Sequence, residues 1–358
     1  ASVSTSMIFA VALLAATVDL SAELKTRIEA AHVPAMQATV VNAEGIVAHG
    51  SAGVTKIGSN DPVTNADAFH IGSCTKPFTA TILGILVEEK KIGWDSKVVD
   101  LFPDWKIRGD YKDVTLADFL SHEAGLPPYG DEEEMKKLPP MKGTPTENRR
   151  RFAEYVLGQP PSISPRTQFQ YSNADYVIAA AIAEKVSKKS WEELVRTRIF
   201  EPLHMASAGI GWPLRVWGHE ETNGTLKPVD PHGSYQLQSF LAPAGDLHMS
   251  SDDLAEFLRA HLLAMNGKKT LISPATAAVM HTKRKKSGLG FGVATVAGFN
   301  DVATHSGSAD TMVTVIAIAP HNNVAVVVST NAASDSATKA VGAELRDLLT
   351  RFATPGPH

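Results

Sequence analysis

The sequence predicts an α+β fold: an α/β sandwich lobe, in which helices flank one antiparallel sheet, and an all-helical lobe inserted into it. Two observations lead to this prediction. β-Branched runs of strand length occur near both ends of the chain, whereas the middle carries apolar residues at helical spacing. Because a sheet must bury its apolar faces against another layer, strands from both ends are expected to join in one sheet.

The N-terminal part is predicted to form a helix followed by a hairpin. Apolar residues recur at helical spacing from Leu20 to about His32. Two strand-like runs, 36–41 and 46–50, are separated by a four-residue turn. These two strands are therefore expected to lie side by side in the sheet.

The middle of the chain is predicted to be mainly helical. Thr115 begins a short helix with Asp118 three residues on, a spacing typical of a helix N-cap. Residues 127–147 are rich in proline, glycine and charge, so a long loop at the rim of a site is expected there. Longer helices are expected at 75–89, 149–158, 175–187, 190–200, 251–265 and 273–283.

The C-terminal part returns to a strand-like composition. Strands are expected at 293–297, 312–319 and 324–330, and the turn residues 320–323 join the last two as a hairpin. A helix at 338–352 closes the chain. These strands complete the sheet that the N-terminal hairpin begins.

The composition excludes several classes of function. The net charge of the 358 residues is -4, so nucleic acid is not an expected partner, and the basic run 283–286 is expected to be a solvated loop. Cys74 is the single cysteine, which rules out an intrachain disulfide and favours a small buried filler. No metal is expected, because no His-x-x-x-His or cysteine pair occurs, and no other cofactor is expected, because Gly288, Gly290 and Gly292 lack the strand–turn–helix setting of a dinucleotide site.

The N-terminal segment 1–19 contains an apolar run at 7–16. The run has the length of a signal-peptide core and is too short to cross a bilayer, so no stable membrane span is expected. It lacks the basic residues that usually precede such a core. An export signal and an extra buried helix are both consistent with it, and the compartment is left open.

A serine and a lysine lie three residues apart where an irregular stretch becomes a long apolar helix. Positions i and i+3 share a helix face, so Ser73 Oγ and Lys76 Nζ are expected to meet at the helix N-terminus. Pro77 falls in the first turn, where its missing N–H costs nothing. The helix dipole there favours negative charge on the serine oxygen. This spacing is the S-x-x-K motif.

Taken singly, each polar cluster has a plain structural explanation. A second S-x-x-K copy at Ser336–Lys339 fits a helix cap followed by a solvated lysine. Tyr171-Ser172-Asn173 precedes a helix, so Asn173 fits a cap with Tyr171 packed beneath it. His305-Ser306-Gly307-Ser308, at the end of one strand and just before another, fits a glycine-containing turn.

The order of the clusters favours a different interpretation. Ser73 and Lys76, then Tyr171 and Asn173 on a loop, then the His305 cluster beside a sheet strand, is similar to the order in the serine β-lactamase and penicillin-binding-protein superfamily. Within it the chain resembles the class C β-lactamase group, with its D,D-peptidase, D-aminopeptidase and family VIII esterase relatives. The resemblance covers about 20–352 and extends to the stretches 120–127, 169–176, 199–205 and 242–247.

The resemblance implies one β-lactamase-like catalytic domain over residues 20–358, with its active site between two lobes. The α/β lobe would comprise residues 20–70 and 285–358, and the inserted helical lobe residues 71–284.

The resemblance also implies the catalytic roles. Ser73 is expected to be the nucleophile that forms an acyl-enzyme, and it needs a base because a serine hydroxyl is a poor nucleophile near neutral pH. Lys76 and Tyr171 are the candidates for that base and are expected to act as a coupled pair, with Tyr171 returning the proton to the leaving group. Which of the two holds the proton at rest stays open.

Further residues are implied to bind the substrate. Asn173 would hold Lys76 and hydrogen-bond the acyl side chain. The backbone N–H groups of Ser73 and Ser308 would form an oxyanion hole, and losing one such donor typically costs about 10²–10³ in rate. His305, Ser306 and Gly307 would bind along the strand edge, where glycine permits a close approach.

The residue at position 305 guides the prediction of substrate. The third motif of the family often begins with lysine, and His305 is mostly neutral near pH 7, which argues against avid β-lactam hydrolysis. The sequence therefore predicts a carboxylesterase of small esters, with a D-alanyl-D-alanine peptidase as the second choice and a weak class C-type β-lactamase as the third. A catalytically silent scaffolding homologue is disfavoured, because every expected catalytic position is filled.

Overall fold

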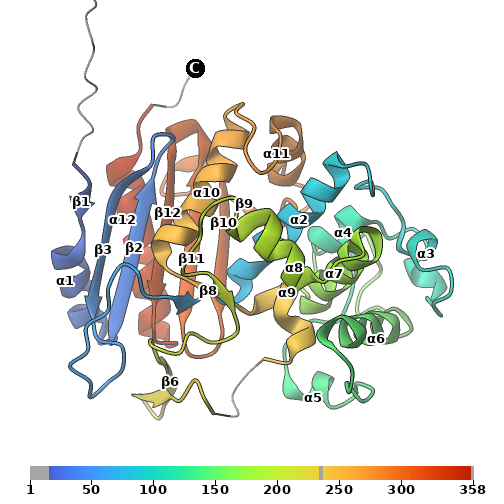
Figure 1. Ribbon diagram of the computed structural model, residues 1–358, viewed down its shortest axis with the longest axis horizontal. Helices are drawn as coiled ribbons and strands as arrows, with labels where there is room; N and C mark the ends of the chain where they lie inside the picture. The colour runs from blue at the N-terminus through green and yellow to red at the C-terminus, as the bar shows by residue number, and fades with distance from the viewer. Residues whose placement is uncertain (1–15, 234–236, 356–358) are drawn as a thin grey trace, which may run out of the picture.

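The computed structural model describes residues 16–233 and 237–355, so the apolar run 7–16 lies almost wholly outside the described residues. The main sheet has seven strands in the order β1-β3-β2-β12-β11-β10-β9, with β1 parallel to β3 and the other neighbours antiparallel (Figure 1). The strands are β1 (Val18–Asp19), β2 (Ala35–Val41), β3 (Ile46–Gly53), β9 (Gly292–Val296), β10 (Phe299–Ser308), β11 (Val313–Ala319) and β12 (Val324–Thr330).

Helices cover both faces of this sheet. Helices α1 (Ser21–Ala31) and α12 (Asp335–Phe352) pack on one face, and α10 (Ser251–Met265) packs on the other. The alternation of β12 explains the two layers: Val326 and Val328 join the core under α1 and α12, whereas Val327 joins the core on the α10 side. The prediction of one sheet built from both ends of the chain and flanked by helices is confirmed.

The second lobe consists of helices packed around α2 and α7, beside the sheet (Figure 1). Its helices are α2 (Lys76–Glu88), α3 (Val98–Leu101), α4 (Leu116–Leu120), α5 (Glu132–Met135), α6 (Pro145–Leu157), α7 (Asn173–Ser187), α8 (Trp191–Val195), α9 (Ala242–Gly245) and α11 (Pro274–His281). A π-helical turn (Arg196–Phe200) extends α8. Over residues 16–233 and 237–355, no helix combines the length and the apolar character that crossing a membrane requires.

Short strands and turns connect the two lobes. Strands β4 (Phe69–His70), β8 (Leu247–Met249) and β5 (Gly209–Ile210) form a small sheet, and β6 (Gly218–Thr222) pairs with β7 (Thr225–Val229) as a hairpin. Strand β4 leads at once into the turn that carries Ser73, so the small sheet fixes where that turn begins.

Helix α10 departs from the expected division of the chain. Residues 251–265 were assigned to the inserted helical lobe, and that assignment is wrong, because α10 lies against β2 and β12 of the sheet (Figure 1). Thr39 Oγ1 of β2 donates to Asp252 Oδ1 at 2.6 Å and lies 2.8 Å from Ser251 Oγ. An amphipathic pattern predicts a buried helix face, but it does not predict which element covers that face.

Two further segments differ from the sequence-based prediction. The His305 cluster was expected to form a turn at the end of a strand, but it lies within strand β10, which runs from Phe299 to Ser308 and pairs with β9 and β11 on its two sides. The expected loop at 127–147 contains α5 and the first turn of α6, which Thr144 begins with a capping box to Glu147.

A buried arginine connects three helices of the second lobe. Arg149 of α6 is fully buried, and its guanidinium lies 2.6 Å from Glu184 of α7 and 2.7 Å from Glu192 of α8. Taking charges out of water is costly unless their partners complete the hydrogen bonds, so these helices are fixed to one another by this network.

We predict that Arg149→Ala lowers the free energy of unfolding by about 3–5 kcal/mol, because it leaves a buried carboxylate without its counter-charge. Urea unfolding measures the change. The exposed neighbour Arg151 is the matched control, and Arg151→Ala should change stability by less than about 0.5 kcal/mol. Equal stabilities of the two variants would contradict the assigned role of the network.

Candidate active site

Ser73 lies on a tight turn that leads directly into a helix. The 3-10 turn Gly72–Thr75 follows β4, and α2 begins at Lys76 with Pro77 in its first turn. The side chains of Ser73 and Lys76 share one face, and Lys76 Nζ donates to Ser73 Oγ at 3.1 Å. The spacing of the S-x-x-K motif thus produces the contact that it predicts, with Ser73 half-buried at the helix N-terminus.

The amine of Lys76 is fully buried and has two further acceptors. Lys76 Nζ donates to Asn173 Oδ1 and to the backbone oxygen of Ala244, each at 2.8 Å. A protonated amine can donate to these two oxygens and to Ser73 Oγ at once. A neutral amine can still donate to Asn173 and Ala244 while its lone pair faces the Ser73 hydroxyl. The geometry therefore accommodates both protonation states.

Tyr171 approaches Ser73 from a loop in front of α7. Its hydroxyl donates to Ser73 Oγ at 2.7 Å, and its ring centroid lies 4.7 Å from Lys76 Nζ. Backbone and side-chain bonds on both sides hold the loop: Gln170 N–H donates to His122 O at 2.8 Å, and Ser172 Oγ donates to Pro127 O at 2.6 Å. Ser172, rather than Asn173, is the side chain that caps α7.

His122 and Asp175 form a buried pair behind Tyr171. The sequence did not predict that this pair belongs to the site. His122 Nδ1 lies 2.7 Å from Asp175 Oδ2, and the His122 ring centroid is 4.5 Å from that of Tyr171. Burial lowers the pKa of His122 well below its usual value and raises the pKa of Asp175 well above its own. Both shifts favour an uncharged pair. The one sequence signal for His122 was its place in the stretch 120–127, which supported the family resemblance but gave His122 no role.

The end of β10 lies directly against the Ser73 turn. A side chain on Gly307 would collide with Ile71 O and approach Ser73 N to 2.8 Å, and one on Gly72 would approach Ser308 N to 2.6 Å. Gly72 also has a φ of +50°, in the left-handed region that favours glycine. Because both Gly72 and Gly307 lack a side chain, the backbone of residues 307–308 can contact the backbone of residues 71–74. We call these two facing backbone segments the glycine seam.

His305 lies two residues before Gly307 on β10, so its side chain is on the same face of the sheet as the glycine seam. Its Nδ1–H donates to Ser306 O at 2.8 Å, and both residues line a cavity together with Tyr171. Burial, together with the positive charge of Lys76, lowers the pKa of His305 to about 4. The ring is therefore neutral near pH 7 and provides no fixed charge there.

Two cavities flank the Ser73–Tyr171 pair. One, of about 330 Å³, is lined by Ser73, Asn173 and Ser308 together with the apolar side chains of Trp212, Leu237 and Leu241. The other, of about 500 Å³, is lined by Tyr171, Phe169, His305 and Ser306, and also by Lys283 and Lys286. Two tryptophans of the segment between β5 and β6 differ in their surroundings: Trp212 lines the first cavity, whereas Trp217 packs beneath Lys56.

The basic run 283–286 divides between two environments. Arg284 lies 2.9 Å from Asp118 and 3.0 Å from Glu123, and Lys285 lies 3.7 Å from Glu123. Lys283 and Lys286 instead reach the 500 Å³ cavity, with Lys286 Nζ 5.7 Å from the Phe169 ring centroid. All four residues are exposed and lie outside helices and strands, as expected of a solvated loop. In addition, Arg284 and Lys285 anchor the loop to carboxylates, and Lys283 and Lys286 line a cavity.

Other chemistries find little support around Ser73. Cys74 is fully buried, and burial raises the pKa of its thiol, so the reactive thiolate is absent at neutral pH. Across residues 16–233 and 237–355, no group of three or more histidine, cysteine, aspartate or glutamate side chains is placed to hold a metal ion. The groups in direct contact with Ser73 Oγ are the phenol of Tyr171 and the amine of Lys76.

Comparisons of the sequence with known proteins find several relatives of this chain. Penicillin-binding protein 4 of Amycolatopsis lactamdurans is 28% identical over 259 residues, covering 70% of this chain and 65% of that protein. The beta-lactamase of Escherichia coli (strain K12) is 24% identical over 250 residues, covering 68% and 61%. Unguisins hydrolase ungD' of Aspergillus campestris is 29% identical over 216 residues, covering 58% and 39%. The chain thus spans 39% to 65% of the length of these curated relatives.

Solved structures agree on the fold. The octameric penicillin-binding protein homologue from Pyrococcus abyssi superposes with a TM-score of 0.75 at 25% identity, covering 92% of this chain and 76% of that one. The D-amino acid amidase from Ochrobactrum anthropi SV3 superposes with a TM-score of 0.75 at 19% identity, covering 92% and 96%, and shows the fold alone. The family model described as Beta-lactamase matches residues 20–351, and this chain therefore belongs to the beta-lactamase family of serine hydrolases.

Proposed function

We propose that this chain hydrolyses small carboxylic esters through an acyl-enzyme formed on Ser73. One observation carries the proposal: Ser73 Oγ accepts a hydrogen bond from Tyr171 at 2.7 Å and lies 3.1 Å from Lys76 Nζ. A hydroxyl with two proton-transfer partners in direct contact is the arrangement that nucleophilic catalysis by serine needs.

In the proposed acylation step, Ser73 Oγ attacks the ester carbonyl and gives its proton to the Lys76–Tyr171 pair. Tyr171 then returns a proton to the departing alkoxide, which keeps the leaving group from carrying away a full negative charge. Lys76 stays in place throughout, because Asn173 and Ala244 hold its other donors. Water later takes the place of the alcohol and releases the acid.

The proposed oxyanion hole consists of the backbone N–H groups of Ser73 and Ser308. Both residues line the 330 Å³ cavity, and the glycine seam brings their backbones together. Donors fixed before the reaction stabilise the tetrahedral oxyanion without having to reorganise. The apolar wall of that cavity suits a short acyl chain, and the 500 Å³ cavity beyond Tyr171 suits the leaving group.

A specific observation favours a second candidate, a peptidase or esterase whose leaving group carries a carboxylate. Lys283 and Lys286 line the leaving-group cavity, and among the described residues neither is ion-paired, unlike Arg284 and Lys285 beside them. They offer positive charge on the side where the neutral His305 ring offers none. A D-alanyl peptide has such a leaving group.

We predict that Ser73→Ala lowers the hydrolysis of p-nitrophenyl acetate by at least about 10³-fold, because it removes the nucleophile. The second S-x-x-K copy provides the matched control: Ser336 is exposed at the start of α12, and Ser336→Ala should keep full activity. A fluorophosphonate probe should label the parent protein and the Ser336 variant only. Absence of labelling in the folded parent protein would instead favour the non-catalytic homologue.

We predict that the ring of His305 does not titrate in the pH profile of kcat/KM between about pH 5 and 8. A histidine with its pKa lowered to about 4 gains its proton only below that range, so it is neutral throughout it. His305→Gln should therefore leave the shape of the profile unchanged. A step near pH 6.5 that disappears in His305→Gln would contradict the lowered pKa.

We predict that Lys286→Gln raises the KM for the acetyl ester of lactate several-fold and leaves the KM for the acetyl ester of lactamide unchanged. The two substrates differ only in the charge of the leaving group, and one exposed ion pair is worth about 0.2–1 kcal/mol. Lys285→Gln, at the residue beside it, is the control. A side-by-side panel with a D-Ala-D-Ala peptide and nitrocefin then ranks the ester, peptide and β-lactam alternatives.

A further inference from the structure

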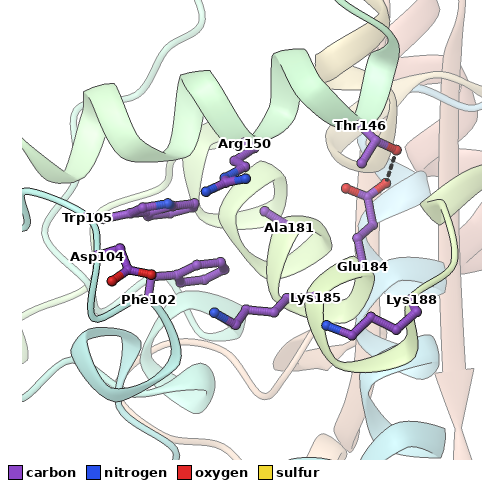
Figure 2. Close-up of a pocket in the computed structure, with 9 residues that line it drawn as sticks. All are labelled: Phe102, Asp104, Trp105, Thr146, Arg150, Ala181, Glu184, Lys185 and Lys188. Carbon is purple, nitrogen blue, oxygen red and sulfur yellow. Dashed lines mark hydrogen bonds between the residues drawn. The ribbon is translucent and has the colours of Figure 1, made fainter.

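A separate cavity of about 300 Å³ lies in the helical lobe and shares no lining residue with the two cavities at Ser73. Figure 2 shows it between the segment after α3, helix α6 and the last turns of α7. Its lining residues that matter below are Phe102, Trp105, Arg150, Ala181, Lys185 and Lys188. Neither the proposed hydrolysis nor the family comparison uses this cavity.

One wall of the cavity is flat and apolar. The rings of Phe102 and Trp105 stack with their centroids 3.7 Å apart and an angle of 11° between their planes. Ala181 of α7 leaves space beside them (Figure 2). Both rings are more than nine-tenths buried, so their orientation is fixed before any ligand arrives. Such a wall accepts a planar or short apolar group at little cost in side-chain freedom.

Three cations surround this wall. Arg150 lies on the Trp105 side and Lys185 on the Phe102 side, with Lys188 beyond it (Figure 2), and Lys185 Nζ is 4.8 Å from the Phe102 ring centroid. Within the part of the chain that the structure describes, none of the three forms an ion pair, whereas their sequence neighbours Arg149 and Lys189 do.

The carboxylates of the cavity do not balance these charges. Glu184 already accepts from Arg149 at 2.6 Å, which leaves the exposed Asp104 as the other acidic residue of the lining. The negative end of the α7 dipole accounts for lysines at 185 and 188. It does not account for Arg150, which lies in the middle of α6, outside the end turns where a helix dipole acts.

We propose that this cavity is a binding site for a small amphipathic carboxylate. Its apolar part would lie on the Phe102–Trp105 wall, and its carboxylate would face Arg150, Lys185 and Lys188. Arg150, Lys185 and Lys188 are all exposed, so each attracts an anion only weakly, and the three together with the apolar wall provide the binding. The volume is at the lower end for ligand pockets and suits about one ring with a short acid chain.

The test is a titration with 3-phenylpropionate, followed by NMR of the tryptophan indole N–H signals. Trp105→Phe assigns the relevant signal. We predict that the Trp105 signal shifts with a Kd of about 1 mM or below, and that Arg150→Gln combined with Lys188→Gln weakens binding at least about tenfold. The neutral 3-phenylpropionamide should bind less tightly than the acid by a similar factor.

Arg151→Gln is the matched control, because Arg151 is exposed on the same helix but does not line the cavity. It should leave the Kd unchanged. The proposal is overturned if the Trp105 signal is unmoved at about 10 mM acid, if the amide binds as tightly as the acid, or if the control weakens binding equally. Binding in the active site would move the Trp212 signal instead, so the result is independent of the proposed hydrolysis.

Discussion

The burial of the Lys76 amine is the constraint on which the rest of the active site depends. A charged amine in the protein interior costs several kcal/mol unless hydrogen bonds replace its water. Lys76 meets that demand with three acceptors, from its own turn, from the start of α7 and from α9. Segments about a hundred residues apart in the chain are therefore held at fixed distances around one hydroxyl. The contacts that make the burial tolerable are also the ones that assemble the site.

The positive charges around Ser73 are not where the family's motifs would place them. The strand position that often provides a lysine in the family holds His305, whose pKa is lowered to about 4. Positive charge on the same side comes instead from Lys283 and Lys286, on a loop that Arg284 anchors to two buried carboxylates. Charge carried on a loop can be repositioned more readily than charge on a strand of the sheet.

Local signals in the sequence predicted most of the fold, and non-local contacts account for what they missed. Apolar spacing and N-caps are properties of neighbouring residues, so most helices and the contact between Ser73 and Lys76 could be predicted from the sequence. The extent of strand β10 could not, because its polar residues, such as Asn300 and Asp301, occupy a strand only by pairing with β9 and β11. The placement of α10 and the pair His122–Asp175 likewise depend on which distant element supplies the partner.

The glycine seam separates the parts of the site that tolerate change from those that do not. Any side chain at position 72 or 307 would force the turn and the strand apart, so substitution there is blocked by backbone atoms that have no room to move. The walls of the two flanking cavities consist of ordinary side chains, which can be exchanged one at a time. Directed evolution of this scaffold therefore has more freedom at partly exposed wall residues such as Leu237 and Phe169 than at the two glycines.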